Sequence, residues 1–145
     1  MGKTVKDSSK AVSRLRTAGL RPTRQRVELA SVLFKGHDRH VTAESLHEEV
    51  VSLGLKISLA TVYNTLHQFT RAGLLRQVIV DAARGYFDTN TGDHQHFFLE
   101  EEGTLIDIPG EDIMVSGVPV PPSGMAVDRV DVVVRVKRTP SALRT

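Results

Sequence analysis

The sequence predicts an α+β protein in which an N-terminal winged-helix domain is followed by a small α/β domain. Apolar residues recur at helical spacing from residue 11 to residue 71 and at alternating spacing in later segments. Two of the predicted helices open with the same capping pattern, and a predicted hairpin follows them directly. The charge of the chain also changes sign near residue 87, which indicates two parts with different roles.

Length and composition describe a folded chain without thiol chemistry. The 145 residues are 40% hydrophobic and 25% charged, which is typical of one folded domain or two small ones. There is no cysteine, which excludes disulfides, a Cys-based structural zinc site, iron–sulfur clusters and a cysteine nucleophile. No apolar run reaches the roughly 18 residues of a membrane span. The first residues are not followed by the apolar segment of a secretory signal peptide. We therefore expect a cytoplasmic protein with no membrane partner.

The net charge of +2 hides an uneven distribution. Residues 1–87 contain 14 Lys and Arg against 7 Asp and Glu, a balance of +7. Residues 88–145 contain 5 against 10, a balance of −5. A basic region suits a polyanion such as DNA, and an acidic region suits cations or serves solubility. Chance variation is the alternative explanation, so the periodicity has to support the division.

Two helices are predicted in the first 36 residues. The first has apolar residues at helical spacing up to Gly19, namely Ala11, Val12, Leu15 and Ala18. Residues 1–19 are therefore expected to be an N-terminal extension and the first helix. The second opens at Thr23 and ends at Gly36, and its apolar face contains Val27, Leu29, Ala30, Leu33 and Phe34. The polar residues 36–40 are expected to form a loop.

The next two helices begin with one shared signal. Thr42 and Ser58 can each accept a hydrogen bond from a free backbone N–H, which caps a helix. Apolar residues flank each cap as a hydrophobic staple, Val41 with Leu46 and Ile57 with Val62. The inward stripes are Leu46, Val50 and Leu53 in the first helix, and Leu59, Val62, Leu66 and Phe69 in the second. This pair is typical of a helix-turn-helix.

A hairpin follows the pair. Residues 74–80 and 85–88 are predicted strands on either side of a turn at residues 81–84. A helix-turn-helix with such a hairpin is a winged helix, which we expect to span residues 20–87.

The outward face of the second helix of the pair suits base edges better than phosphates. Asn and Gln pair bidentately with adenine, and Ala or Thr can touch a thymine methyl group. Arginines outside this helix are available for the DNA backbone or a narrow minor groove. The residues that we expect to bind DNA are Arg21, Arg24, Ser58, Ala60, Thr61, Tyr63 and Asn64. The alternative role is half-buried packing for Tyr63 and ordinary solvent exposure for His67.

The second half is predicted to contain three strands and to need a partner. Residues 97–100 and 104–108 are strand candidates, and apolar residues alternate from Val130 to Val136. The prolines at 119, 121 and 122 exclude a long regular helix through residues 117–124. About 50 residues are too few for an independent core, so a second copy should complete this half as a homodimer. We expect a hinge at 88–92, a dimerisation and sensing domain at 93–138, and a tail at 139–145.

Histidines and carboxylates gather where this second half begins. His94 and His96 are two positions apart, so on a strand both imidazoles point to one face. The carboxylates of Asp88, Asp93 and Asp107 are candidates to join them, and so is His40 or His37 from the helical half. Nitrogen and oxygen ligands suit Zn²⁺, Fe²⁺ or Mn²⁺ without selecting one. The alternative is a pair of surface histidines on a metal-free protein that binds DNA constitutively.

Several of these segments together resemble the ferric uptake regulator family. They are residues 20–26 (LRPTRQR), 40–44 (HVTAE), 59–66 (LATVYNTL) and 94–96 (HQH). The resemblance extends over residues 20–137. Residues 85–90 (GYFDTN) and 129–135 (RVDVVVR), with the lack of cysteine, are most similar to the iron response regulator branch of α-proteobacteria.

The resemblance implies a winged-helix DNA-binding domain, a hinge and an α/β dimerisation domain. It implies that the helix around Tyr63 enters the major groove of an A·T-rich palindrome, with Arg21 near the minor groove. It also implies a hinge metal site formed by His40, Asp88, His94, His96 and Asp107. In this branch the signal is iron availability, often sensed through haem.

The sequence therefore predicts a dimeric, sequence-specific transcriptional regulator of iron or haem homeostasis. It should bind double-stranded DNA at A·T-rich inverted repeats under the control of iron or haem. The expected cofactor is a divalent Fe, Mn or Zn ion, with haem on His94 and His96 as the other candidate. The alternatives are a regulator of the same fold that senses manganese, zinc or peroxide, and a small metal-dependent hydrolase built on His94 and His96.

Overall fold

The computed structural model describes residues 2–140, with side chains from residue 8 onward, so positions 141–145 of the expected tail lie outside the described residues. The chain divides into two compact units, one ending at Thr91 and the other starting at Gly92. We describe each unit by itself. None of the helices within residues 2–140 is long and apolar enough to span a bilayer.

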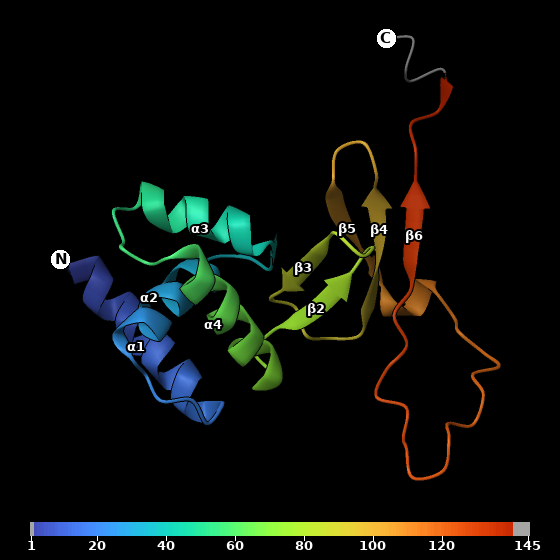
Figure 1. Ribbon diagram of the computed structural model, residues 1–145, viewed down its shortest axis with the longest axis horizontal. Coiled ribbons are helices and arrows are strands. Elements are labelled where there is room, and N and C mark those ends of the chain that lie inside the picture. Colours follow the sequence, from blue (N-terminus) through green and yellow to red (C-terminus); the bar gives the residue numbers. More distant parts are fainter. Residues whose placement is uncertain (1, 141–145) are drawn as a thin grey trace. The chain divides into compact units, whose positions relative to one another are not determined.

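The first unit contains four helices (Figure 1): α1 (Gly2–Thr17), α2 (Arg24–Leu33), α3 (Ala43–Ser52) and α4 (Leu59–Arg71). The predicted caps Thr42 and Ser58 are confirmed, because each accepts a hydrogen bond from a backbone N–H in the first turn of its helix, and Thr23 caps α2 in the same way. Thr42 and Ser45 form a reciprocal capping box. Helix α1 begins well before the apolar stripe that predicted it, since the polar residues ahead of Ala11 include no proline or interior glycine.

The helices enclose one apolar core. Its fully buried members include Leu15, Leu29, Leu33, Leu46, Val62, Leu66 and Phe69. Two residues of the predicted stripes are exceptions, because Leu53 is 60% exposed and Leu59 is 42% exposed. Both lie at a helix end, where the stripe runs past the edge of the core. Thr65 is buried in α4 instead.

A three-stranded antiparallel sheet completes this unit in the order β1-β3-β2. The predicted hairpin is β2 (Arg76–Ile79) and β3 (Gly85–Asp88). The prediction of a loop through residue 40 was wrong, because His40 and Val41 form β1 and pair with Asp88 and Phe87. A strand of two residues shows no periodicity, so the sequence pattern could not reveal it.

The second unit is a three-stranded sheet in the order β5-β4-β6. Its strands are β4 (His94–Leu99), β5 (Thr104–Pro109) and β6 (Val133–Val136), and β6 runs parallel to β4. A single 3-10 turn, η1 (Gly110–Asp112), follows β5. Strand β6 begins later than predicted, since Val130 and Val132 lie before it.

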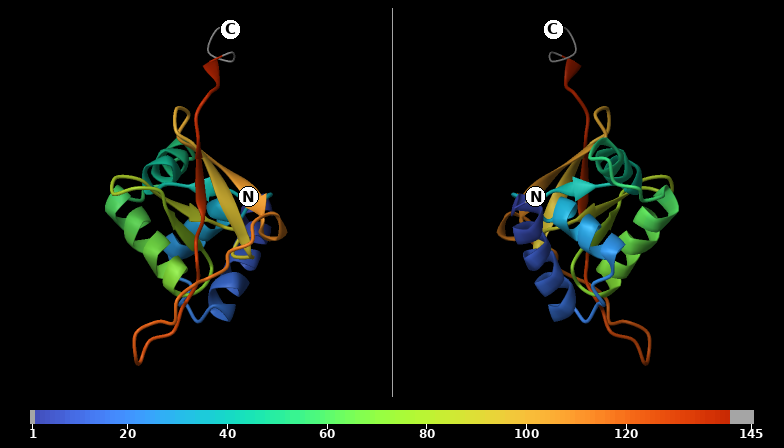
Figure 2. Two further views of the ribbon diagram at one scale, coloured as in Figure 1. Left: turned by 90° about the vertical axis from the view of Figure 1, so that its right-hand side faces the viewer. Right: turned by 90° about the vertical axis from the view of Figure 1, so that its left-hand side faces the viewer.

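Residues 113–132 connect η1 to β6 as an open loop without helix or strand (Figure 2), and this loop includes residues 117–124, where the prolines excluded a long helix. Several large apolar side chains of this loop are exposed: Met114, Val115, Val118, Val120, Met125, Val127 and Val130. The apolar side chains buried within the described part of this unit are Phe98, Leu105 and Ile108. The α+β class is confirmed, with a winged helix in the first unit and a small sheet in the second.

Candidate functional site

Helix α4 presents the predicted nucleic-acid face. Ala60 and Asn64 are exposed, and Tyr63 is 52% exposed, which leaves its ring accessible. The Ser58 Oγ accepts from the Thr61 backbone N–H at 3.1 Å and donates to the Thr61 Oγ1 at 3.0 Å. Both hydroxyls therefore take part in the helix cap, while the exposed side chains lie on the first two turns after it.

Three arginines at the start of α2 make different contacts. Arg21, ahead of the helix, is exposed, and Arg24 in the first turn has a 91% exposed side chain that pairs with Glu28 at 3.0 Å. The guanidinium of Arg26 instead donates twice to Gln68 Oε1, at 3.0 and 3.2 Å, and so connects α2 to α4. Sequence reasoning missed this contact, because it joins residues far apart in the chain.

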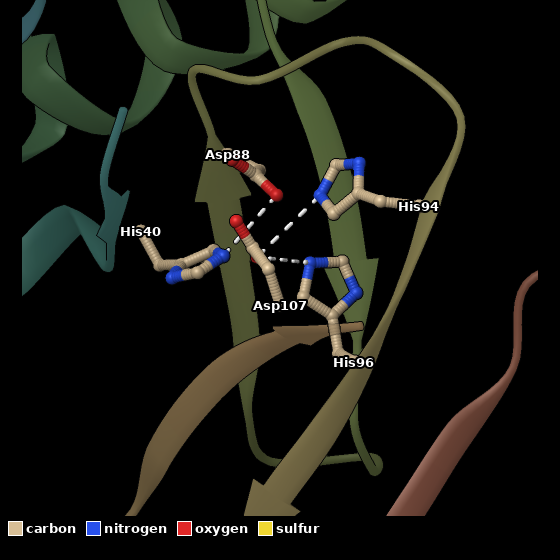
Figure 3. A group of neighbouring side chains, drawn as sticks. All are labelled: His40, Asp88, His94, His96 and Asp107. Carbon is tan, nitrogen blue, oxygen red and sulfur yellow. Dashed lines mark ion pairs between the residues drawn. The ribbon is translucent and has the colours of Figure 1, made fainter. Parts of the chain in front are cut away.

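One set of possible metal ligands lies in the first unit. His40 on β1 and Asp88 on β3 are register partners, and His40 Nε2 is 3.2 Å from Asp88 Oδ2 (Figure 3). The carboxylate is fully buried, and its other oxygen, Oδ1, accepts the Asn90 backbone N–H at 2.9 Å. This bond orients the carboxylate, whose Oδ2 faces His40.

A second set lies in the sheet unit. His94 and His96 point to one face of β4, with ring centroids 4.6 Å apart (Figure 3). Asp107 on β5 is the register partner of His96, and its Oδ1 is 3.4 Å from His96 Nε2 and 3.6 Å from His94 Nε2. His94 Nδ1 is 2.7 Å from the Gly92 carbonyl oxygen. Since a carbonyl can only accept, Nδ1 carries the hydrogen and Nε2 keeps a lone pair.

Both sets have the chemistry that a divalent metal requires. Two ligand atoms on one tetrahedral ion, each about 2.0 Å from it, are about 3.3 Å apart. The nitrogen–oxygen separations of 3.2 Å in the first set and of 3.4 and 3.6 Å in the second are close to this value. The donors are imidazole nitrogens and carboxylate oxygens, which suit Zn²⁺, Fe²⁺ or Mn²⁺.

Two other possible metal ligands named from the sequence, His37 and Asp93, do not join either set. His37 is exposed in the loop before β1. Asp93 is exposed, and both its carboxylate and its carbonyl oxygen lie against Gly110. The haem prediction gains no support, because the rings of His94 and His96 are buried at 4% and 1% exposure and face Asp107.

The segment that joins the units is anchored to the first of them. The Thr89 backbone N–H donates to the Arg39 carbonyl at 3.1 Å, and the Arg39 N–H donates to Thr89 Oγ1 at 2.9 Å. The Arg39 guanidinium makes two hydrogen bonds to the Glu49 carboxylate, which raise the pKa of Arg39. The start of the expected hinge is thereby held to α3 through Arg39.

The comparisons with known proteins agree with this architecture. The model of the Ferric uptake regulator family matches residues 17–127. The Ferric uptake regulation protein of Bordetella parapertussis is 33% identical over 102 residues, which are 70% of this chain and 73% of that protein.

Solved structures extend the match. The ferric uptake regulator of Pseudomonas aeruginosa, solved with manganese, is 28% identical with a TM-score of 0.66 over 88% of this chain and 97% of the other. That of Vibrio cholerae, at 23% identity and a TM-score of 0.67 over 88% and 98% of the two chains, shows the same fold. This chain therefore belongs to the ferric uptake regulator family of metal-responsive, DNA-binding transcription regulators, and it is not a hydrolase.

Proposed function

We propose that this chain is an iron-responsive regulator in which one divalent metal ion is held by His40, Asp88, His94, His96 and Asp107. The observation that carries the proposal is that each unit holds an incomplete set of ligands with metal-like spacing. Asp88 and His94 are six positions apart, so the backbone keeps them within about 20 Å of each other. Two donors from one unit and three from the other give the coordination number of a transition-metal site.

The residues around the ligands support this role. When bound, a divalent ion links the elements that carry its ligands through one shared positive charge. The Asn90 N–H orients Asp88, and the Gly92 carbonyl fixes the tautomer of His94. Residues 88–92 then act as a hinge between a DNA-binding domain at 20–87 and a dimerisation and sensing domain at 93–138.

We favour a metal ion over haem as the effector. The P. aeruginosa regulator was solved with manganese, and the curated relatives are ferric uptake regulators. Iron is therefore the signal that we propose, and manganese or zinc is the alternative that the same ligands allow. The lack of cysteine and residues 85–90 support a place in the iron response regulator branch.

The DNA-binding surface that we propose consists of Arg21, Arg24, Ser58, Ala60, Thr61, Tyr63 and Asn64. Asn64 and Tyr63 offer a bidentate amide and an aromatic edge to the major groove, which suits an A·T-rich inverted repeat. The exposed arginines serve the phosphates or the minor groove. Two copies would present two such helices to half-sites about one DNA turn, roughly 34–36 Å, apart.

Homodimerisation through the second unit is part of the proposal. Phe97 and Ile106 on the sheet and Met114 and Val120 on the loop are 38%, 47%, 92% and 92% exposed. A unit of this size cannot bury enough apolar surface alone, so a second copy is the occupant that completes it.

The test is DNA binding measured by fluorescence anisotropy. The operator is first selected from a randomised duplex library with Mn²⁺ present. The chelated protein is then titrated with Fe²⁺ under anaerobic conditions, and separately with Mn²⁺ and Zn²⁺. We expect metal to change the DNA affinity by about 5- to 150-fold, and Asp88→Asn and His96→Ala to abolish that change. His37→Ala is the matched control and should keep it.

Two results would overturn the proposal. One is a metal response that survives Asp88→Asn and His96→Ala together. The other is a selected sequence that Tyr63→Ala and Asn64→Ala bind as tightly as the parent chain does.

A further inference from the structure

His67 lies on α4 one turn after Tyr63, between two other aromatic rings. Its ring centroid is 4.5 Å from that of Tyr63, at an interplanar angle of 65°, and 5.2 Å from that of Phe87, at 85°. Both are edge-to-face contacts, a favourable geometry for aromatic pairs. The buried Nε2 of His67 has no hydrogen-bond partner among the described residues. The ring contacts, rather than a bond from Nε2, therefore connect His67 to its neighbours.

Phe87 connects this contact to a set of metal ligands. It lies on β3 with 3% exposure, and it pairs with Val41 on β1 and with Gln77 on β2. The next residue is Asp88, whose register partner on β1 is His40. A change in how β1 and β3 meet at His40 and Asp88 thus acts directly on the backbone of Phe87.

We infer that His67 is a positioning residue that couples the His40–Asp88 pair to Tyr63 of the recognition helix. The contacts run from Asp88 through Phe87 and His67 to Tyr63, and all of them lie within the first unit. The inference rests on the proposed function, because it requires that His40 and Asp88 bind the metal.

The chemistry of the ligand pair supplies the driving change. His40 Nε2 and Asp88 Oδ2 are 3.2 Å apart and are in contact with each other. A bound divalent ion would replace this direct contact with two bonds to the metal, and the 3.2 Å separation is already close to that of two ligands on one ion. Metal binding would therefore hold β1 and β3 together at this point and restrict the motion of the two strands, with little displacement of either.

Close packing carries that change to Tyr63. The rings of Phe87 and His67 touch, and packed interiors have few voids to absorb a shift. Tyr63 is the exposed end of the series, so a restriction of its ring motion alters what the helix offers to a base edge. Metal occupancy would therefore change the reading surface itself, in addition to any effect on the hinge.

The chain provides a single-site optical probe for this coupling. It contains two tyrosines, Tyr63 and Tyr86, and no tryptophan. The substitution Tyr86→Phe leaves Tyr63 as the only source of tyrosine fluorescence. Zn²⁺ is the probe ion, because it has no redox chemistry and no geometric preference from d electrons.

The experiment compares His67→Leu with His67→Phe, each in the full-length Tyr86→Phe chain. Leu fills space without a ring, whereas Phe keeps both edge contacts and lacks only the nitrogens. We expect Zn²⁺ to change Tyr63 emission in the Tyr86→Phe chain and in His67→Phe, and to leave it nearly unchanged in His67→Leu. His47→Leu, on α3, is the matched control and should respond like the Tyr86→Phe chain.

DNA binding gives a second readout. The ratio of Kd without Zn²⁺ to Kd with Zn²⁺ should fall by about 2- to 30-fold in His67→Leu and stay unchanged in His67→Phe. Zn²⁺ affinity, measured by calorimetry, should be the same in both variants, which separates coupling from loss of the site. A His67→Leu chain with a full Zn²⁺ response, or a His67→Phe chain as impaired as His67→Leu, would overturn the inference alone. Zn²⁺ binding that Asp88→Asn leaves unchanged would overturn the proposed function, and this inference with it.

Discussion

Phe69 in the first unit and Phe98 in the second are both fully buried, but their surroundings differ. Phe69 belongs to a cluster supplied by all four helices and by β3. Phe98 has Leu105 and Ile108 as the other buried apolar residues of its unit within the described chain. Large apolar side chains such as Met114 and Val120 are 92% exposed there. The first unit thus closes its own core, whereas the second leaves apolar surface exposed that the second copy of the proposed homodimer would cover.

The largest difference in stability between the two units should appear when these phenylalanines are replaced by alanine. We expect Phe69→Ala to lower the free energy of unfolding of the first unit by about 3–5 kcal/mol at any protein concentration. The effect of Phe98→Ala should depend on protein concentration, because the proposed homodimer links folding of the second unit to association. Urea denaturation followed by circular dichroism at several concentrations measures both. A concentration-independent effect of Phe98→Ala would show that the second unit is stable by itself.

The next effect concerns the exposed loop. Met114→Asp combined with Val120→Asp should weaken the dimer about 100-fold, or about 2.7 kcal/mol, because each charge occurs twice in a two-fold interface. Analytical ultracentrifugation measures the dissociation constant. Ser123→Asp, in the same loop, is the control and should change it little. The melting of the first unit should be unaffected, and an unchanged dimer in the double variant would contradict the comparison.

A smaller effect is expected from Gly110 in the second unit, with a glycine of the first unit as its control. A Cβ at Gly110 would lie 2.8 Å from the carbonyl oxygen of Asp93, and backbone cannot rotate away as a side chain can. We expect Gly110→Ala to destabilise the second unit by about 1–3 kcal/mol and to weaken Zn²⁺ binding, because the clash is next to His94. Gly85→Ala is the control in the first unit, since its Cβ would come no closer than 3.6 Å to Gln77. Thermal melting and calorimetry measure the two effects, and a neutral Gly110→Ala would refute the expectation.

The smallest effect is the pH dependence of the turn between β2 and β3. Hydrogen bonds from the Arg84 guanidinium, joined by the Ala83 and Arg84 backbone N–H groups, hold the pKa of Asp81 below its usual value. The turn should therefore have its full stability above the usual aspartate pKa and lose it as the pH falls through the lowered pKa. A carboxyl NMR titration measures this pKa, and Asp81→Asn should remove the dependence. Titration of Asp81 at or above the usual value would contradict the assignment.

Local signals in the sequence were sufficient for the helices and the hairpin. Thr42 and Ser58 identified two helix starts, because caps and staples depend on neighbours within a few residues. The face shared by His94 and His96 followed from alternation once they were placed on a strand, but the predicted strand began at residue 97 and β4 begins at His94. The contacts that depend on tertiary structure did not follow: β1 is too short for a periodic signal, and Arg26 meets Gln68 across 42 positions. The exposure of Leu53 and Leu59 shows the same limit, since a stripe does not reveal where the core ends.

The side chain of Gln95 constrains what this protein can become by mutation. Its amide oxygen accepts from the Val132 N–H at 2.7 Å and its amide nitrogen donates to the Val130 carbonyl at 3.4 Å, so it substitutes for a peptide group at the start of β6. Replacement by glutamate would set a second acceptor against that carbonyl. The hydrogen bonds of the sheet therefore disfavour a carboxylate at position 95. A further metal ligand would not readily evolve there, even where binding a second cation would benefit the cell.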